Sequence, residues 1–101
     1  KIDASSEEKA QKSLEKVLKG NDFEDLAKFQ VGWRILKGQV DGMTFDEVKD
    51  AGKDQFKPGL FGLGKGYDDE VDSLENTLKM TYKTEKDAAK GLAGILSGAV
   101  R

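Results

Sequence analysis

The sequence from Asp22 to Leu36 reads DFEDLAKFQVGWRIL and has apolar residues on two faces of a helix. The first row is Phe23, Ala27, Val31 and Ile35, and the second is Leu26, Phe29, Trp33 and Leu36. A helix that is apolar on two sides must be covered on two sides. We therefore expect this helix at the centre of the fold, either fully covered by the other elements or with one row partly open to a partner.

Length and composition predict one small domain with a modest core. The chain has 101 residues, of which 36% are charged and 37% are hydrophobic. Seventeen basic and nineteen acidic residues give a net charge of -2. This balance provides no overall field that would attract nucleic acid or an anionic membrane, so we expect no nucleic-acid partner.

The absence of cysteine and histidine excludes several kinds of chemistry. Disulfides, thiolate zinc sites, cysteine nucleophiles and Ser-His-Asp triads are all impossible. The acidic cluster at 68–75 lacks the alternating ligands and central glycine of a calcium loop, and it better suits the N-terminus of a helix, where it complements the dipole. We therefore expect no catalytic residue, no metal and no cofactor.

Helix start signals recur along the chain. Three pairs have the spacing of a capping box, in which two residues three apart cap each other's backbone N–H groups. These pairs are Ser5 with Glu8, Asn21 with Glu24, and Thr44 with Glu47. Gly20 is a candidate for the end of the first helix. Because the connection after it is so short, we expect the first two helices to lie antiparallel as neighbours.

The later part of the chain continues the helical pattern. Asp68 and Thr84 are the expected caps of a fourth and a fifth helix, although these two could also form one continuous helix. No useful segment alternates with a period of two, so strands are not expected. The predicted fold is an all-α, single-domain bundle of four or five helices at approximately 6–19, 22–37, 45–57, 68–83 and 85–98, with a loop at 58–67.

A glycine-rich loop lies between the third and fourth predicted helices. Its residues 59–65 match the first seven positions of a phosphate-binding loop, but Gly66 replaces the Ser or Thr that holds magnesium and no strand precedes it. We therefore expect no nucleotide site. Leu60, Phe61 and Leu63 are large and apolar for a loop, so they either pack onto the core or contact a partner.

The partner-binding hypothesis combines Leu60, Phe61 and Leu63 with any uncovered part of Phe29 and Trp33. Aromatic residues are enriched at interface centres, but these two belong to the core if later helices pack over them. Gly94 and Gly98 have Gly-x-x-x-Gly spacing, and their apolar run is too short to span a bilayer. We expect close helix packing there.

Two segments resemble a family of small bacterial lipoproteins of unknown activity. The N-terminal sequence KIDASSEE, followed by KSLEKV at 12–17, is similar to the start of the mature lipoprotein, and DGMTFDEV at 41–48 is similar to a Gly-x-Thr-x-x-Glu-Val helix start in the family. The resemblance implies a periplasmic location, with a lipid anchor on a cysteine a few residues before Lys1. It implies membrane contact through that anchor only. It points to no particular activity, since none is established for the family.

Two classes of function remain open. The first is a non-enzymatic protein-binding module of the bacterial envelope, of which an immunity or inhibitor protein that blocks a toxin enzyme is a sharper form. The alternative is a structural or stress-related lipoprotein without a discrete site. An enzyme ranks third. An adjacent gene for a secreted toxin would favour inhibition, whereas a solitary gene would favour the structural alternative.

Overall fold

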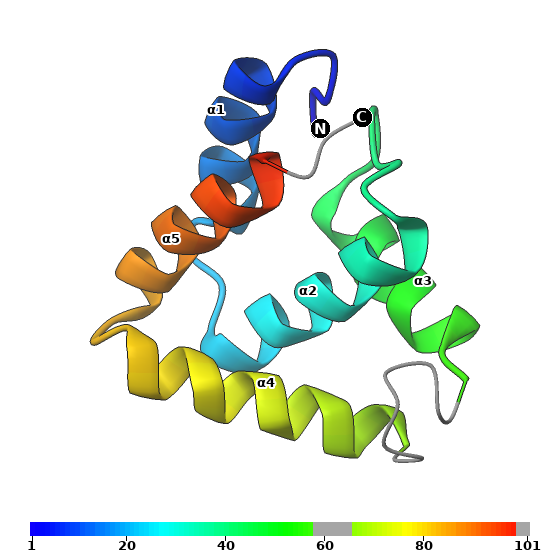
Figure 1. Ribbon diagram of the computed structural model, residues 1–101, viewed down its shortest axis with the longest axis vertical. Coiled ribbons are helices and arrows are strands. Elements are labelled where there is room, and N and C mark those ends of the chain that lie inside the picture. Colours follow the sequence, from blue (N-terminus) through cyan, green and yellow to red (C-terminus); the bar gives the residue numbers. More distant parts are fainter. Residues whose placement is uncertain (58–65, 99–101) are drawn as a thin grey trace.

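The computed structural model describes residues 1–57 and 66–98, and all regular structure within them is helical (Figure 1). Five helices follow in chain order: α1 (Glu7–Leu18), α2 (Phe23–Leu36), α3 (Phe45–Gln55), α4 (Tyr67–Thr81) and α5 (Glu85–Ser97). The prediction of an all-α bundle is confirmed. The fourth and fifth helices are separate, because the backbone is extended at Tyr82 and α5 begins with its own cap at Thr84.

Helix α2 lies at the centre of the bundle (Figure 1). It packs against α3 and α4 and also touches α5. Its buried residues come from both predicted rows and include Leu26, Phe29, Val31 and Trp33. The expectation that this helix is covered on more than one side is therefore confirmed.

Helix α1 packs mainly against α5, so the prediction that it is an antiparallel neighbour of α2 is wrong. Ala10, Leu14 and Leu18 form its buried face. The connection between the two helices is short, as predicted. However, Gly20, at a φ of 84°, turns the chain so that α2 does not pack along α1. The apolar face of α1 is covered by α5 instead.

Two of the expected helix caps are present. The Thr44 hydroxyl accepts a hydrogen bond from the Glu47 N–H at 3.2 Å, and the Glu47 carboxylate accepts one from the Thr44 N–H at 3.1 Å, which completes a capping box. At the start of α5, the Thr84 hydroxyl accepts from the Asp87 N–H at 3.1 Å. Both helices therefore begin at the predicted residues.

The other predicted caps are wrong by one or two positions. Ser6 caps α1 in place of Ser5, whose hydroxyl donates to Asp3. Asp22 caps α2 in place of Asn21, whose amide donates to the carbonyl oxygens at the end of α1. In each case the side chain expected to cap the helix is hydrogen-bonded to another group.

Helix α4 has no side-chain cap. It begins at Tyr67, directly after Gly66, so Asp68 lies inside the first turn and is not the N-cap. Asp69 and Glu70 lie in the same turn. The three carboxylates complement the positive end of the helix dipole, as the charge pattern predicted.

The N-terminal residues form part of the core. Ile2 is only 2% exposed, its N–H donates to the Met43 carbonyl oxygen at 2.9 Å, and its carbonyl oxygen accepts from the Gly42 N–H at 2.8 Å. The Ala4 N–H donates to the Asp41 carboxylate at 2.8 Å. These bonds join the start of the chain to the connection between α2 and α3. No sequence pattern indicated this contact.

Two glycines allow α2 and α3 to cross in backbone contact. A Cβ atom added to Gly52 would lie 2.8 Å from the backbone nitrogen of Gly32, and one added to Gly32 would overlap the carbonyl oxygen of Val48. The predicted close packing at Gly94 is absent within residues 1–57 and 66–98, because a Cβ there would meet none of their atoms within 4 Å. The close glycine in α5 is Gly91, where a Cβ would overlap the Tyr82 ring.

We expect Gly32→Ala to lower the free energy of unfolding by about 2 to 3 kcal/mol, because the added methyl group meets backbone that cannot move aside. Gly94→Ala is the matched control, and it should stabilise the protein by about 1 kcal/mol because it replaces a helical glycine in open space. Urea unfolding followed by circular dichroism measures both. A Gly32→Ala variant as stable as the parent would contradict the close crossing.

We expect Ile2→Ala to cost about 2 kcal/mol, because it removes a buried side chain from the core. Ile95→Ala serves as control: its side chain is 63% exposed, and exposed substitutions usually change stability by less than about 0.5 kcal/mol. Thermal melts of both variants test the docking of the N-terminal segment. Equal effects would mean that Ile2 is not held in the core.

Candidate functional site

A cleft of about 530 Å³ opens between α2, α3 and α4. It exists because α3 and α4 both pack on α2 and present charged residues along the space between them. The lining residues are Glu24 and Lys28 from α2, Lys49, Asp50 and Lys53 from α3, and Tyr67, Asp68, Val71 and Asp72 from α4. The cleft therefore combines charges of both signs with an aromatic and an aliphatic side chain.

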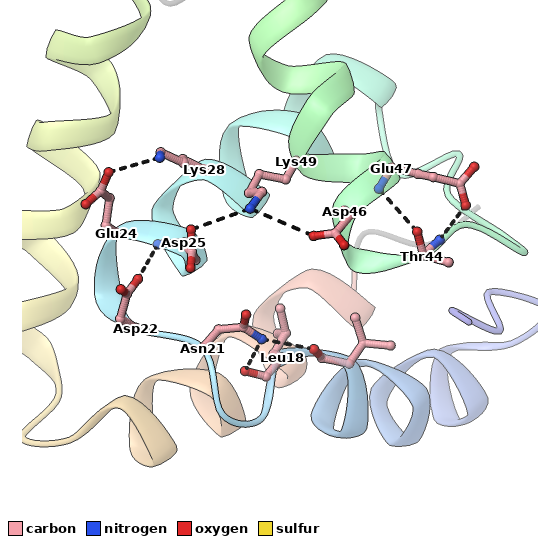
Figure 2. A network of polar contacts seen from close by, with 11 residues as sticks. Leu18, Asn21, Asp22, Glu24, Asp25, Lys28, Thr44, Asp46, Glu47 and Lys49 are labelled. Atoms are coloured by element: carbon pink, nitrogen blue, oxygen red, sulfur yellow. Dashed lines mark hydrogen bonds and ion pairs between the residues drawn. The ribbon is translucent and has the colours of Figure 1, made fainter.

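Ion pairs hold two of the cleft lysines in place (Figure 2). The Lys28 ammonium lies 2.9 Å from the Glu24 carboxylate, and this hydrogen bond raises the pKa of Lys28. The Lys49 ammonium lies between the carboxylates of Asp25, at 3.6 Å, and Asp46, at 3.8 Å. Partly exposed pairs of this kind contribute less than about 1 kcal/mol each, so their main effect is to position the side chains.

Four other charged side chains in the cleft have no ion-pair partner within residues 1–57 and 66–98. They are Lys53 and Asp50 on α3, and Asp68 and Asp72 on α4. All four are exposed. Their charges remain available to a ligand that carries complementary groups of both signs.

Tyr67 connects the cleft to the end of α3. Its ring meets the Phe56 ring edge to face, with centroids 5.7 Å apart and planes at 74°. Partial burial raises the pKa of its phenol. Since Phe56 directly follows α3 and Tyr67 begins α4, their contact brings the end of α3 close to the start of α4. Leu60, Phe61 and Leu63 lie between these two residues in sequence.

Sequence reasoning missed Tyr67, which it placed in the loop at 58–67. The available signal was an aromatic residue directly before an acidic helix start. Its partner Phe56 was expected only as a residue of the third helix. The two rings come together because α3 and α4 both pack on α2. This long-range packing cannot be read from either local sequence pattern.

Phe29 and Trp33 lie in the core, so their proposed contact with a partner does not agree with the structure. Phe29 is fully buried and Trp33 is 3% exposed. The Phe29 ring stacks on the Phe45 ring, with centroids 5.1 Å apart and planes at 11°. They are buried because α3 packs over this row of α2. We expected a core role for these two residues if a later helix covered them.

Leu60, Phe61 and Leu63, the other predicted partner-binding residues, fall outside the described residues, as does the Gly-x-x-x-x-Gly-Lys match at 59–65. Their roles stay predictions. Within the described ranges, no group of three or more Asp or Glu residues is arranged to hold a metal ion. The helices of the same ranges are all too short or too polar to cross a membrane.

Comparison of the chain with known protein families, with curated proteins and with solved structures gave no match. Its function must therefore be inferred from its own residues.

We expect the Tyr67 phenol to ionise above 10.0, the usual pKa of tyrosine. Below that pH the phenol is neutral in both the folded and the unfolded chain, and stability is fully present. As the pH rises through the raised pKa, the partly buried phenolate is disfavoured and stability falls. Absorbance titration of Tyr82→Phe, in which Tyr67 is the only tyrosine, measures this pKa. A midpoint at or below that of a free tyrosine amide would contradict its burial.

Proposed function

We propose that this chain is a non-enzymatic protein-binding module, and that its binding surface consists of the α2–α3–α4 cleft together with Leu60, Phe61 and Leu63. One observation carries the proposal: Tyr67 lines the cleft and contacts Phe56, and these two residues flank in sequence the stretch that contains Leu60, Phe61 and Leu63. Large apolar residues that follow in sequence on charged residues of a helical scaffold give the composition of a protein interface.

The charges of the cleft favour a protein partner over a small ion. Lys53 on α3 and Asp68 and Asp72 on α4 give walls of mixed sign, and the largely buried Val71 also lines the cleft. A site for a single small anion or cation would concentrate one sign of charge. A partner surface with an apolar side chain flanked by both acidic and basic groups fits these walls better.

The proposed location is the bacterial periplasm, with a lipid anchor ahead of Lys1. The two segments that resemble small lipoproteins, 1–8 and 41–48, are hydrogen-bonded to each other through Ile2, Gly42 and Met43. The two segments thus form one structural unit, and we treat their similarity to small lipoproteins as a single feature. Inhibition of a toxin by an immunity protein is the sharper form of the proposal, and a structural or stress-related lipoprotein is the alternative.

A photoreactive amino acid at position 53, in the protein produced in its source cells, tests the binding surface. We expect it to crosslink to one discrete protein. The same group at position 80 is the control, because Met80 is 87% exposed and lies outside the cleft. Charge reversal at Asp68 should weaken the captured complex about fivefold to tenfold, or roughly 1 kcal/mol. Failure to crosslink from position 53, or equal crosslinking from position 80, would favour the structural alternative.

We expect Phe61→Ala to change stability by less than about 1 kcal/mol and to weaken partner binding by about 2 kcal/mol, as for an aromatic anchor of an interface. Urea unfolding of the isolated chain tests the first part without knowledge of the partner. A loss of about 3 kcal/mol or more would show that the ring belongs to the core and would remove Phe61 from the binding surface.

A further inference from the structure

The three helices that form the cleft, α2, α3 and α4, carry a larger acidic surplus than the whole chain. Together they contain eleven acidic and five basic residues, which is a net charge of -6, whereas the net charge of the chain is -2. The remaining residues are therefore net basic. A cleft surrounded by one sign of charge focuses the field and favours a partner group of the opposite sign.

Two of the three lysines in the cleft are already neutralised by carboxylates. The Lys28 ammonium lies 2.9 Å from the Glu24 carboxylate (Figure 2). The Lys49 ammonium lies between Asp25 and Asp46, at 3.6 Å and 3.8 Å. These lysines therefore do not offset the other carboxylates of the cleft.

Three carboxylates in the lining have no ion pair among residues 1–57 and 66–98, against one ammonium. The carboxylates are Asp50 on α3 and Asp68 and Asp72 on α4, and the ammonium is Lys53. The helix dipole accounts for Asp68 in the first turn of α4, but Asp72 lies beyond that turn. Like charges four residues apart on a helix repel each other, so a cation in the cleft would relieve this repulsion.

Tyr67 and Val71 add a partly apolar surface to the same cleft. Val71 is 3% exposed and Tyr67 is partly buried. Burial raises the pKa of the Tyr67 phenol; Lys28 opposes this effect, and Asp68 and Asp50 add to it. The ring is thus within electrostatic reach of carboxylates from both walls. A guanidinium suits such a surface, because it is planar and weakly hydrated, stacks on aromatic rings and pairs with carboxylates through two N–H groups.

We propose that the partner places an arginine side chain in this cleft, with its guanidinium among the carboxylates of α3 and α4 and its aliphatic part against Tyr67 and Val71. The inference rests on the proposed function, since it names the chemistry by which a protein partner is recognised. An acidic residue next to this arginine would pair with Lys53, so the mixed charges of the walls set the direction of the partner segment. Lysine fits less well, because its ammonium is compact and strongly hydrated.

The test is a titration of the isotope-labelled chain with N-acetyl-arginine amide, followed by NMR of the backbone amides. We expect saturable shifts at Asp50, Tyr67 and Asp72 at millimolar probe concentrations. N-acetyl-citrulline amide has nearly the same shape without the charge, and it should give no saturable shift. N-acetyl-lysine amide has the same charge and should bind at least about threefold more weakly. No saturable shift with the arginine probe would overturn the inference.

Matched double variants locate the site. Asp50→Asn with Asp72→Asn should raise the dissociation constant of the arginine probe at least about fivefold. Asp54→Asn with Asp69→Asn is the control, because it removes the same charge from exposed positions of α3 and α4 that do not line the cleft, and it should change binding less than about twofold.

Equal loss in both double variants would overturn the cleft as the site. Equal binding of the citrulline probe would overturn the role of charge, and equal binding of the lysine probe would overturn the choice of arginine. The titration uses no partner protein. It can therefore fail while a crosslink from position 53 still captures a partner, and it can succeed where that crosslink fails.

Discussion

The contact between Gly32 and Gly52 is the constraint on which the rest of the structure depends. Two helices normally lie 8 to 10 Å apart because their side chains separate them. Here the helices meet without side chains at the crossing, so that the α2 and α3 backbones touch. This close approach accompanies the stacking of Phe45 on Phe29 and brings Lys49 within reach of Asp25.

The close crossing also explains why the cleft lies where it does. With α3 fixed on one side of α2, α4 covers another side, and the charged faces of α3 and α4 border the remaining space. The aromatic contact between Phe56 and Tyr67 links their neighbouring ends. The walls that α3 and α4 contribute to the cleft are thus helices whose positions are set by packing against α2.

The sequence predicted the elements well and their arrangement poorly, for physical reasons visible in particular residues. The two apolar rows of α2 are local signals, and they correctly indicated a covered central helix. The caps at Ser6 and Asp22 were missed because neighbouring Ser5 and Asn21 have equally suitable side chains, and only the folded chain shows that these are bonded elsewhere. The prediction that Phe29 and Trp33 contact a partner was wrong for a similar reason. The helix that covers them, α3, lies later in the chain, and its packing is not a local signal.

The docking of Ile2 has a mechanical consequence. A force applied at Lys1 reaches Ile2 before α1, and Ile2 is hydrogen-bonded to Gly42 and Met43. The load therefore passes into the connection between α2 and α3, next to the close helix crossing, before it can unwind the first helix from its end. These hydrogen bonds and the burial of Ile2 therefore protect the apolar face of α1 from a load applied at the N-terminal end of the chain.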